Sequence, residues 1–197
     1  MSNIVTENIF GAPIFNNKIE VDNKKIEEYC YMLKSKNKGI SLSNIGGWQS
    51  EKLQGSIPEL NSLFLSFLEN VKEYAKILKV KKKYNFEISR LWVNINGLKD
   101  YNIPHVHSDS FISGVYYVKS NSEKSGKINF YHPTQFLMSC LWKEKYFETF
   151  DNANSVVWSY NPLQSYLYLF PSFLAHSVNP NLITEDRISI SFNIILK

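Results

Sequence analysis

The spacing of apolar residues along the chain changes near the lysine run at residues 81–83. Before this run, two stretches place an apolar residue at every third or fourth position, which is the period of an amphipathic α-helix. After the run, polar and apolar residues alternate in several short stretches, as they do in a β-strand with one buried face. The pattern therefore predicts helices first and strands afterwards.

Two helices are predicted in the first part. Asp22 can cap a helix that carries one apolar side and ends in the polar stretch 35–39. The apolar side of this helix consists of Ile26, Tyr29, Cys30 and Leu33. The second helix opens with Ser56-x-x-Glu59, which has the form of a capping box, with Pro58 in its first turn. Its apolar stripe, expected to pack on a sheet, consists of Leu60, Leu63, Phe64, Phe67, Leu68, Val71, Ala75 and Leu78.

Strands are predicted at residues 90–96, 111–118, 127–131, 156–159, 165–170 and 188–196. Residues 134–154 follow neither period, and we expect a long loop or a lid rich in aromatic residues, namely Trp142, Tyr146, Phe147 and Phe150. Helices followed by several short strands favour a mainly β (α+β) fold, an antiparallel β-sandwich or jelly roll buttressed by N-terminal helices. We expect one domain over residues 1–197, with a helical part over about 1–85 and a jelly-roll core over about 86–197.

Composition narrows the class of protein. Hydrophobic residues make up 44% and charged residues 20% of the chain, and the net charge of +4 is mild, so the lysine runs are interpreted as solvated surface and no nucleic-acid partner is expected. Cys30 and Cys140 are predicted to be buried free thiols of a reducing compartment. Neither a signal peptide nor an apolar run of about 18 residues is visible, so the expected location is cytoplasmic, without a membrane partner.

The histidines carry the candidate chemistry. Three of the four lie in the segments 104–109 and 170–176. His107 and Asp109 form a His-x-Asp pair, which together with His176 matches the two-histidine, one-carboxylate ligand set of non-haem iron(II) oxygenases. In an alternative ligand set, His105 and His107 coordinate together as an alternating pair on one strand face. Otherwise His105 contacts the substrate or its own loop, and the fourth histidine, His132, is expected to be a turn residue.

Such a metal leaves room for a bidentate 2-oxo acid and for dioxygen, and the distal carboxylate of the 2-oxo acid then needs a cation. Only Arg90 and Arg187 among the 22 basic residues are arginine, whose planar fork lysine cannot reproduce. Arg187 follows His176 by eleven residues and is the predicted carboxylate ligand. Arg90 is interpreted as the partner of a structural ion pair. Hydroxyl groups expected to assist Arg187 belong to Ser189, Tyr117 and Ser113. Asn94 and Trp92 are expected to line the substrate side or to support the metal ligands.

Several motifs in order resemble a known family. They are Gly46-Gly47-Trp48-Gln49-Ser50, Trp92-x-Asn94, Gly97, Asn102-x-x-His105-x-His107, Ser113-Gly114-Val115-Tyr116-Tyr117-Val118, Phe170-Pro171-Ser172-x-Leu174-x-His176-x-Val178 and Arg187-x-Ser189-x-Ser191-Phe192-Asn193. From about residue 44 to the end, the chain is similar to 2-oxoglutarate/Fe(II)-dependent oxygenases of marine bacteria and their phages. The resemblance implies a double-stranded β-helix, iron(II), 2-oxoglutarate and O2. In many relatives the segment that corresponds to residues 105–108 resembles His-x-His-Pro, and the position that corresponds to Asp109 is not acidic. The spacing of the histidines also resembles that of aspartyl/asparaginyl hydroxylases, which lack that carboxylate ligand.

The sequence thus predicts a non-haem iron(II) and 2-oxoglutarate-dependent dioxygenase, a hydroxylase that decarboxylates 2-oxoglutarate to succinate. Its substrate is expected to be a small molecule or a protein side chain, in a bacterial or phage-infected cell. The alternative is a cupin-like protein that binds a metal or a small molecule without oxidative turnover, but this alternative gives no reason for the Arg187-x-Ser189 motif.

Overall fold

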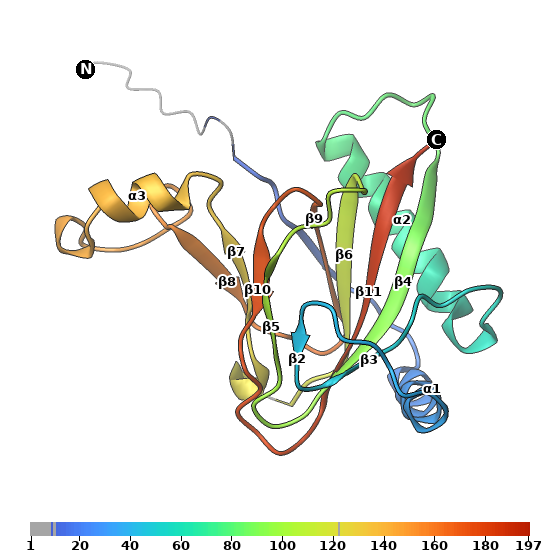
Figure 1. The fold of residues 1–197 in the computed structure, drawn as a ribbon. Helices are drawn as coiled ribbons and strands as arrows, with labels where there is room; N and C mark the ends of the chain where they lie inside the picture. The colour runs from blue at the N-terminus through green and yellow to red at the C-terminus, as the bar shows by residue number, and fades with distance from the viewer. Residues whose placement is uncertain (1–8, 10, 122) are drawn as a thin grey trace.

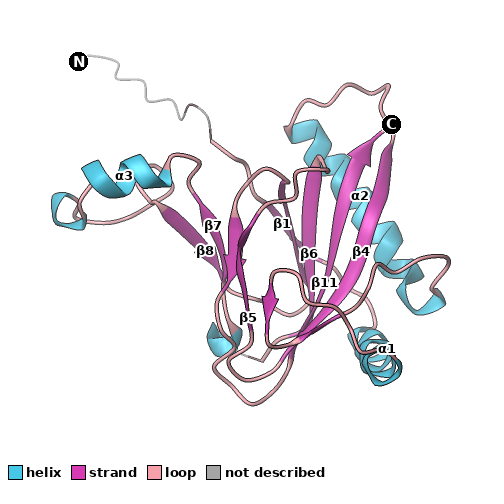
Figure 2. Cartoon of the chain, in the orientation of Figure 1, coloured by secondary structure: helices cyan, strands magenta, loops and turns pink. Residues whose placement is uncertain are grey.

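Two antiparallel β-sheets face each other, and two long helices cover the outer face of the larger sheet (Figures 1 and 2). The computed structural model describes residue 9 and residues 11–121 and 123–197. The six-stranded major sheet has the order β1-β9-β6-β11-β4-β3, and the five-stranded minor sheet has the order β2-β5-β10-β7-β8. This is the predicted mainly β jelly roll with helices on one side, and the fold class is confirmed.

The strands are β1 (Phe15–Lys18), β2 (Asn44–Ile45), β3 (Trp48–Gln49), β4 (Phe86–Asn96), β5 (Tyr101–His105), β6 (Ile112–Lys119), β7 (Ile128–Tyr131), β8 (Val157–Tyr160), β9 (Tyr166–Pro171), β10 (His176–Val178) and β11 (Arg187–Leu196). The helices are α1 (Asn23–Lys36), α2 (Asn61–Ile77) and α3 (Gln135–Leu141), with 3-10 turns η1 (Pro58–Leu60), η2 (Glu123–Ser125) and η3 (Glu144–Tyr146).

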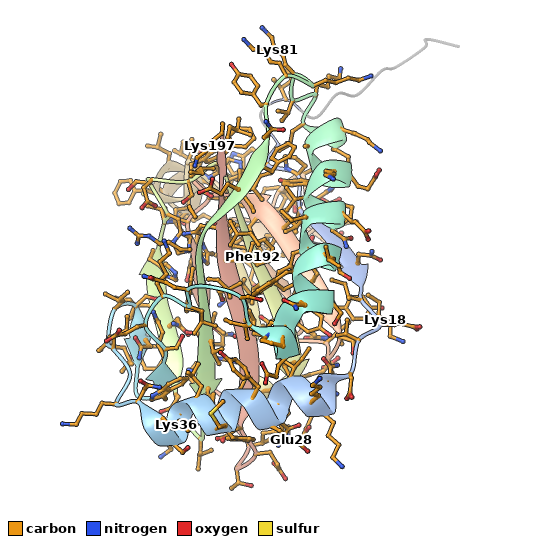
Figure 3. The ribbon with its side chains drawn as sticks, turned by 90° about the vertical axis from the view of Figure 1, so that its right-hand side faces the viewer. Lys18, Glu28, Lys36, Lys81, Phe192 and Lys197 are labelled. Atoms are coloured by element: carbon orange, nitrogen blue, oxygen red, sulfur yellow. The ribbon has the colours of Figure 1, made fainter. Side chains whose placement is uncertain are left out.

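The long central strand β11 separates a hydrophobic core from a polar interior. Side chains alternate across a strand, so Ile188, Ile190, Phe192 and Ile194 all point to the helices. Phe192 stacks on Phe67 of α2 with ring centroids 4.3 Å apart, at the centre of the contact between helix and sheet (Figure 3). The alternate residues of β11 (Arg187, Ser189, Ser191 and Asn193) line the space between the two sheets. One face of this strand therefore builds the core and the other builds a cavity.

A second, smaller cluster fills part of the space between the sheets. Its buried members are Val115, Tyr117, Ile128, Phe130, Tyr168, Phe170 and Leu174. Phe130 of the minor sheet meets Phe170 of the major sheet edge to face at 4.9 Å. This cluster joins the two sheets on one side of the cavity, so the cavity has a packed wall.

Both predicted long helices are present, but the start of the second differs from the expectation. Asp22 caps α1, with its carboxylate accepting from the amide of Lys25 at 3.2 Å. The predicted capping box at Ser56 is wrong. Pro58 is the first residue of η1, which makes Ile57 the cap residue, and no side chain caps this turn. Proline is well suited to the first helical position because its missing N–H has no partner there in any case.

The segment 134–154 forms α3 and η3 at the end of the β7–β8 hairpin and projects away from the two sheets (Figure 1). All seven residues of α3 are at least partly exposed, and Cys140 is exposed there. The prediction that both cysteines are buried is therefore wrong for Cys140 and confirmed for Cys30. No helix in the described part of the chain is long and apolar enough to cross a membrane.

Candidate active site

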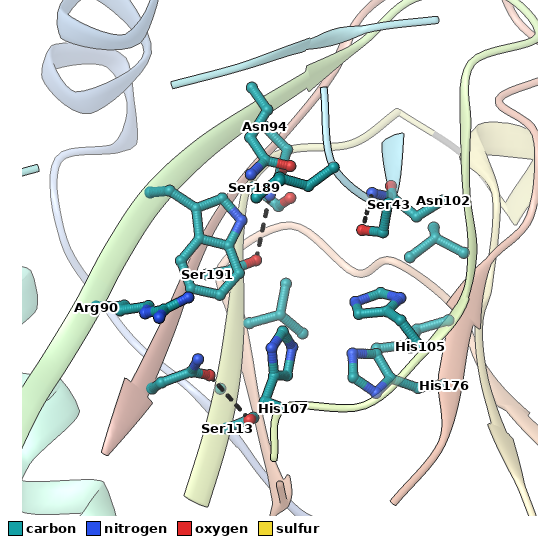
Figure 4. A pocket seen from close by; sticks show the side chains of 18 of the residues that line it. Ser43, Arg90, Asn94, Asn102, His105, His107, Ser113, His176, Ser189 and Ser191 are labelled. Carbon is teal, nitrogen blue, oxygen red and sulfur yellow. Dashed lines mark hydrogen bonds between the residues drawn. The ribbon is translucent and has the colours of Figure 1, made fainter. Parts of the chain in front are cut away.

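Three histidines converge between the sheets. His105 ends β5, His176 begins β10, and the two residues lie directly opposite each other in the antiparallel pairing of these strands. His107 follows β5 and is held by a backbone hydrogen bond from its amide to the carbonyl of Ser172 at 3.0 Å. The ligand nitrogens of the three side chains lie within 4.8 Å of one another, and their rings gather at one side of the pocket (Figure 4). One metal ion can bridge nitrogens at this spacing after small side-chain rotations.

The hydrogen bonds of these rings determine which nitrogen is free. Nδ1 of His105 lies 2.7 Å from the carbonyl oxygen of Ile103, and Nδ1 of His176 lies 3.0 Å from that of Leu174. A carbonyl oxygen only accepts, so Nδ1 carries the proton in both rings and Nε2 keeps its lone pair. This backbone support is the arrangement that orients histidine ligands in metal sites.

Burial keeps the imidazoles neutral. It lowers the pKa of His176 to about 3 and that of His107 to about 4, with a further decrease from the neighbouring histidines, and it also lowers the pKa of His105. A neutral imidazole is the form that binds a metal. The residues present therefore fit a divalent transition metal, and three nitrogen donors suit iron as well as zinc.

Asp109 lies outside this cluster. The His-x-Asp spacing directs both side chains to one side only in a continuous strand, but β5 ends at His105, and Ser108 and Asp109 form a turn. The carboxylate of Asp109 instead pairs with the guanidinium of Arg90 at 2.8 Å, and both side chains are more than half exposed. The structure thus brings His105 to the place where the sequence pattern suggested Asp109.

Arg187 lies at the far end of the cavity in a setting unusual for a cation. It is 2% exposed, and Nη1 donates to the carbonyl oxygens of Ser125 at 2.6 Å, Gly126 at 3.1 Å and Asn179 at 3.4 Å. Burial lowers the pKa of Arg187, yet a guanidinium remains charged. None of the ion pairs among the described residues involves Arg187. Asp100 acts on Arg187 only at longer range, and a buried cation without a directly paired anion is costly, so this position favours an incoming carboxylate.

Two of the residues expected to assist Arg187 are neighbours in the major sheet. Ser189 and Tyr117 face each other across β11 and β6, and both are buried. The hydroxyl of Tyr117 has no hydrogen-bond partner among the described residues. Burial raises the pKa of this hydroxyl, and the neighbouring Arg187 lowers it by a smaller amount. A buried hydroxyl without a partner beside a buried guanidinium can hydrogen-bond to a polar group that binds there.

Ser113 occupies the opposite end of the cavity. It pairs with Asn193, four residues beyond Ser189 along β11, and its hydroxyl is engaged with Ser172 at 2.8 Å and with Asn193 at 2.9 Å. Asn193 is six residues from Arg187, which corresponds to about 20 Å of strand, so Ser113 is not brought together with Arg187.

The two predicted substrate-side residues line the middle of the cavity. The indole of Trp92 lies 5.7 Å from the ring of His107. The amide nitrogen of Asn94 donates to Ser191 at 3.2 Å, while its oxygen is buried without a partner among the described residues. Sequence reasoning assigned no role to Ser191, Asn193 or Lys52, which also line this space. The strict alternation of polar residues along β11 was the signal for the first two of these.

The cavity between the sheets has a volume of about 720 Å3. Its lining includes the three histidines and three basic side chains, Lys52, Arg90 and Arg187, whereas no carboxylate is among the described residues that line it. No residue of the projecting segment 134–154 lines it either. The site is thus a metal-binding candidate inside a cavity of positive charge.

The sequence model of one protein family, described as "Putative 2OG-Fe(II) oxygenase", matches residues 90–193. The match covers more than half of the chain, so the protein belongs to this family of 2-oxoglutarate- and iron(II)-dependent oxygenases. It is therefore an oxidoreductase of the dioxygenase class, with iron(II), 2-oxoglutarate and O2 as cofactor and co-substrates, as predicted. The origin in marine bacteria or phages stays a prediction.

Solved structures share the fold at low sequence identity. A prolyl-4-hydroxylase from Pseudomonas putida has a TM-score of 0.61 and 11% identity, with 91% of each chain covered. A prolyl hydroxylase from Trichoplax adhaerens, in complex with a peptide of hypoxia inducible factor, has a TM-score of 0.62 and 16% identity over 94% of this chain and 83% of that one. HygX from Streptomyces hygroscopicus, with nickel and 2-oxoglutarate bound, has a TM-score of 0.60 and 9% identity over 93% and 83%. Among curated proteins, no sequence matches the chain.

Proposed function

We propose that the protein is a hydroxylase whose iron(II) is held by His105, His107 and His176 and whose 2-oxoglutarate is anchored by Arg187. The observation that carries this proposal is the convergence of three neutral imidazoles in one cavity with a buried guanidinium that has no anionic partner among the described residues. When bound, the iron would supply the oxidation, with O2 as oxidant and 2-oxoglutarate decarboxylated to succinate.

The protein's own residues would bind and orient the two co-substrates and the substrate. Arg187 would hold the distal carboxylate, with hydroxyl hydrogen bonds from Tyr117 and Ser189. The carbonyl groups of Ser125, Gly126 and Asn179 would hold the guanidinium in place by binding Nη1, so that its remaining N–H groups can serve the carboxylate. Trp92 and Asn94 would form the wall against which the substrate packs.

The substrate is expected to be a small molecule or a protein side chain. The cavity volume of about 720 Å3 lies within the range of roughly 300–1,000 Å3 that is common for ligand pockets, so the cavity is large enough for a metabolite or a single side chain. A cytoplasmic location remains a prediction from cysteine usage and the N-terminal sequence, as does the absence of a nucleic-acid partner.

The test of the proposed function measures iron binding and succinate formation in one set of variants. Fe(II)-loaded protein with 2-oxoglutarate and O2 should form succinate without added substrate, and His105→Ala, His107→Ala and His176→Ala should each lose stoichiometric iron and this turnover. His132→Ala is the matched control, because this exposed side chain hydrogen-bonds to Thr134 of its own turn and is not among the described residues that line the cavity.

Asp109→Asn separates the two possible ligand sets. With three histidine ligands, this variant keeps its iron and its succinate formation. Loss of iron from Asp109→Asn, with iron retained in His105→Ala, would instead establish Asp109 as the third ligand. Iron-loaded protein that neither binds nor decarboxylates 2-oxoglutarate would favour the binding-module alternative.

A further inference from the structure

The two arginines of the chain lie at opposite ends of one inner sheet face. Arg187 is on β11, and Arg90 on β4 is paired with Asn193, six residues further along β11. Six residues of antiparallel strand span about 20 Å. Between these ends the face carries Ser189 and Asn94, and then Ser191 and Trp92. One cavity thus has a guanidinium at each end, and the proposed function uses only one of them.

Arg90 belongs to the metal half of the cavity. The ring of His107 is 5.7 Å from that of Trp92, and Trp92 is two residues along β4 from Arg90. In Figure 4 the Arg90 side chain extends from β4 into the pocket, towards the side where His107 lies. Lys52 lies at this end too, because the amide of the next residue, Leu53, donates to the carbonyl of Leu91 at 2.8 Å. Two cations therefore flank the region beside the candidate metal site.

The present partner of Arg90 is easily replaced. The ion pair with Asp109 is more than half exposed on both sides, and ion pairs of this kind contribute little to stability because water screens them. Asp109 is also on a turn, where no strand pairing holds it. An incoming oxyanion can take its place on the guanidinium with little loss.

The charge balance of the site favours such an anion. Three neutral imidazoles bring no negative charge to the metal, unlike a set that includes a carboxylate. The charges of a divalent metal and Arg187 together exceed those of 2-oxoglutarate by one positive charge. Lys52 adds to this excess, and Arg90 does so once Asp109 is displaced. A substrate with a negative group would neutralise part of it.

We propose that the substrate carries an oxyanion, a carboxylate or a phosphate, which Arg90 binds as a bidentate ligand with Lys52 beside it, displacing Asp109. The remainder of the substrate then lies along Trp92 towards the three histidines. Arg90 acts as a specificity-determining residue: it selects the charged end and so sets which part of the substrate faces the metal. This inference rests on the proposed function for the identity of the site.

The test uses three probes on the Fe(II) protein under anaerobic conditions with saturating 2-oxoglutarate, so that Arg187 is already occupied. Phenylacetate, phenyl phosphate and the neutral phenylacetamide are titrated by calorimetry. At least one of the anions should bind, at least about tenfold more tightly than the amide, because hydrogen bonds between charged groups contribute that much. The tighter of the two anions identifies the natural group as carboxylate or phosphate.

Variants connect this binding to Arg90. Arg90→Gln should weaken anion binding about tenfold or more, and Arg90→Lys should restore only part of it, since lysine lacks the bidentate fork. Asp109→Asn should bind as tightly as the wild type or up to about fivefold more tightly, because a weak competitor is removed. Lys72→Gln, on the exposed side of α2, is the matched loss of one charge and should leave the affinity unchanged.

Anion affinity that is the same in Arg90→Gln as in the wild type would overturn the proposal, as would equal affinities for phenylacetate and phenylacetamide with no binding of phenyl phosphate. The proposed function fails separately. Succinate formation that is absent while Arg90-dependent anion binding persists refutes the oxygenase site alone, whereas normal succinate formation with Arg90-independent binding refutes this inference alone.

Discussion

Replacing Arg187 by lysine tests the co-substrate site at its centre. The change keeps the positive charge and removes only the shape of the guanidinium. In the wild type, three carbonyl oxygens occupy Nη1, at 2.6, 3.1 and 3.4 Å. The rest of the fork is then available to a carboxylate. A lysine ammonium has its three donors on one atom, so it cannot satisfy both the carbonyl clamp and two carboxylate oxygens.

The expected magnitude follows from the number of hydrogen bonds lost. A hydrogen bond to a charged group contributes about 1.5–3 kcal/mol, and loss of one such bond to the distal carboxylate corresponds to a change in affinity of about 10- to 150-fold. We therefore expect the KM for 2-oxoglutarate to rise by about this factor in Arg187→Lys. The kcat of uncoupled turnover should change much less, because the distal carboxylate is remote from the metal.

The assay is succinate formation at varied 2-oxoglutarate in Fe(II)-loaded protein, with the melting temperature as a check on folding. Arg90→Lys makes the same chemical change at the other end of the cavity, about 20 Å away along the strand, and should alter the KM for 2-oxoglutarate by less than about threefold. An unchanged KM in folded Arg187→Lys, or an equal rise in Arg90→Lys, would refute the assignment of Arg187.

Three further predictions concern stability. Gly126 has φ +90°, and a Cβ there would collide with the carbonyl oxygen of Asn179 and with Nη1 of Arg187. Gly126→Ala should therefore destabilise the protein by about 1–3 kcal/mol in urea unfolding and raise the KM for 2-oxoglutarate. An unaltered KM would show that the carbonyl groups around Nη1 do not position Arg187. Phe192→Ala removes a fully buried ring from its stack on Phe67 and should cost about 3–5 kcal/mol in the same measurement, with a loss below 1 kcal/mol contradicting the description of the core. The folded-state pKa of His107 is about 4 and that of His176 about 3, below the ordinary value near 6.5, so the unfolded chain binds protons first as the pH falls. The metal-free protein should therefore lose about 4 kcal/mol of stability between pH 7 and pH 5, and stability that is equal at both pH values would contradict neutral buried histidines.

The sequence was informative wherever a local period was visible. The alternation in 188–196 predicted β11, and the 3.6-residue period predicted both long helices. The same alternation predicted that Arg187 and Ser189 share one face of a strand, and in the structure Ser189 lies opposite Tyr117 of β6. Short strands such as β2, β3 and β10 have two or three residues and show no period, so they could not be predicted from the pattern.

The identity of the third metal ligand depended on where a strand ends. The His-x-Asp spacing directs His107 and Asp109 to one metal only if the strand continues through both residues. In the structure β5 stops at His105, and the turn that follows carries Asp109 to Arg90. Likewise, Ser113 and Tyr117 share a face of β6, but the alternation of side chains along a strand does not indicate which end of the cavity each residue reaches. Strand ends and register are determined by tertiary pairing, which a local pattern does not record.

The two-sided nature of β11 has a consequence for how this protein can change during evolution. Its even-numbered residues from Ile188 to Ile194 are packed under the helices, while Ser191 and Asn193 face the cavity near Arg90. Substitutions at the cavity-facing positions leave the core contacts intact, so substrate preference can drift without loss of folding. A single-residue insertion in the strand would do the opposite, because it would exchange the two rows, sending isoleucines into the cavity and serines under the helices. We therefore expect related chains to vary in the side chains of this strand far more readily than in its length.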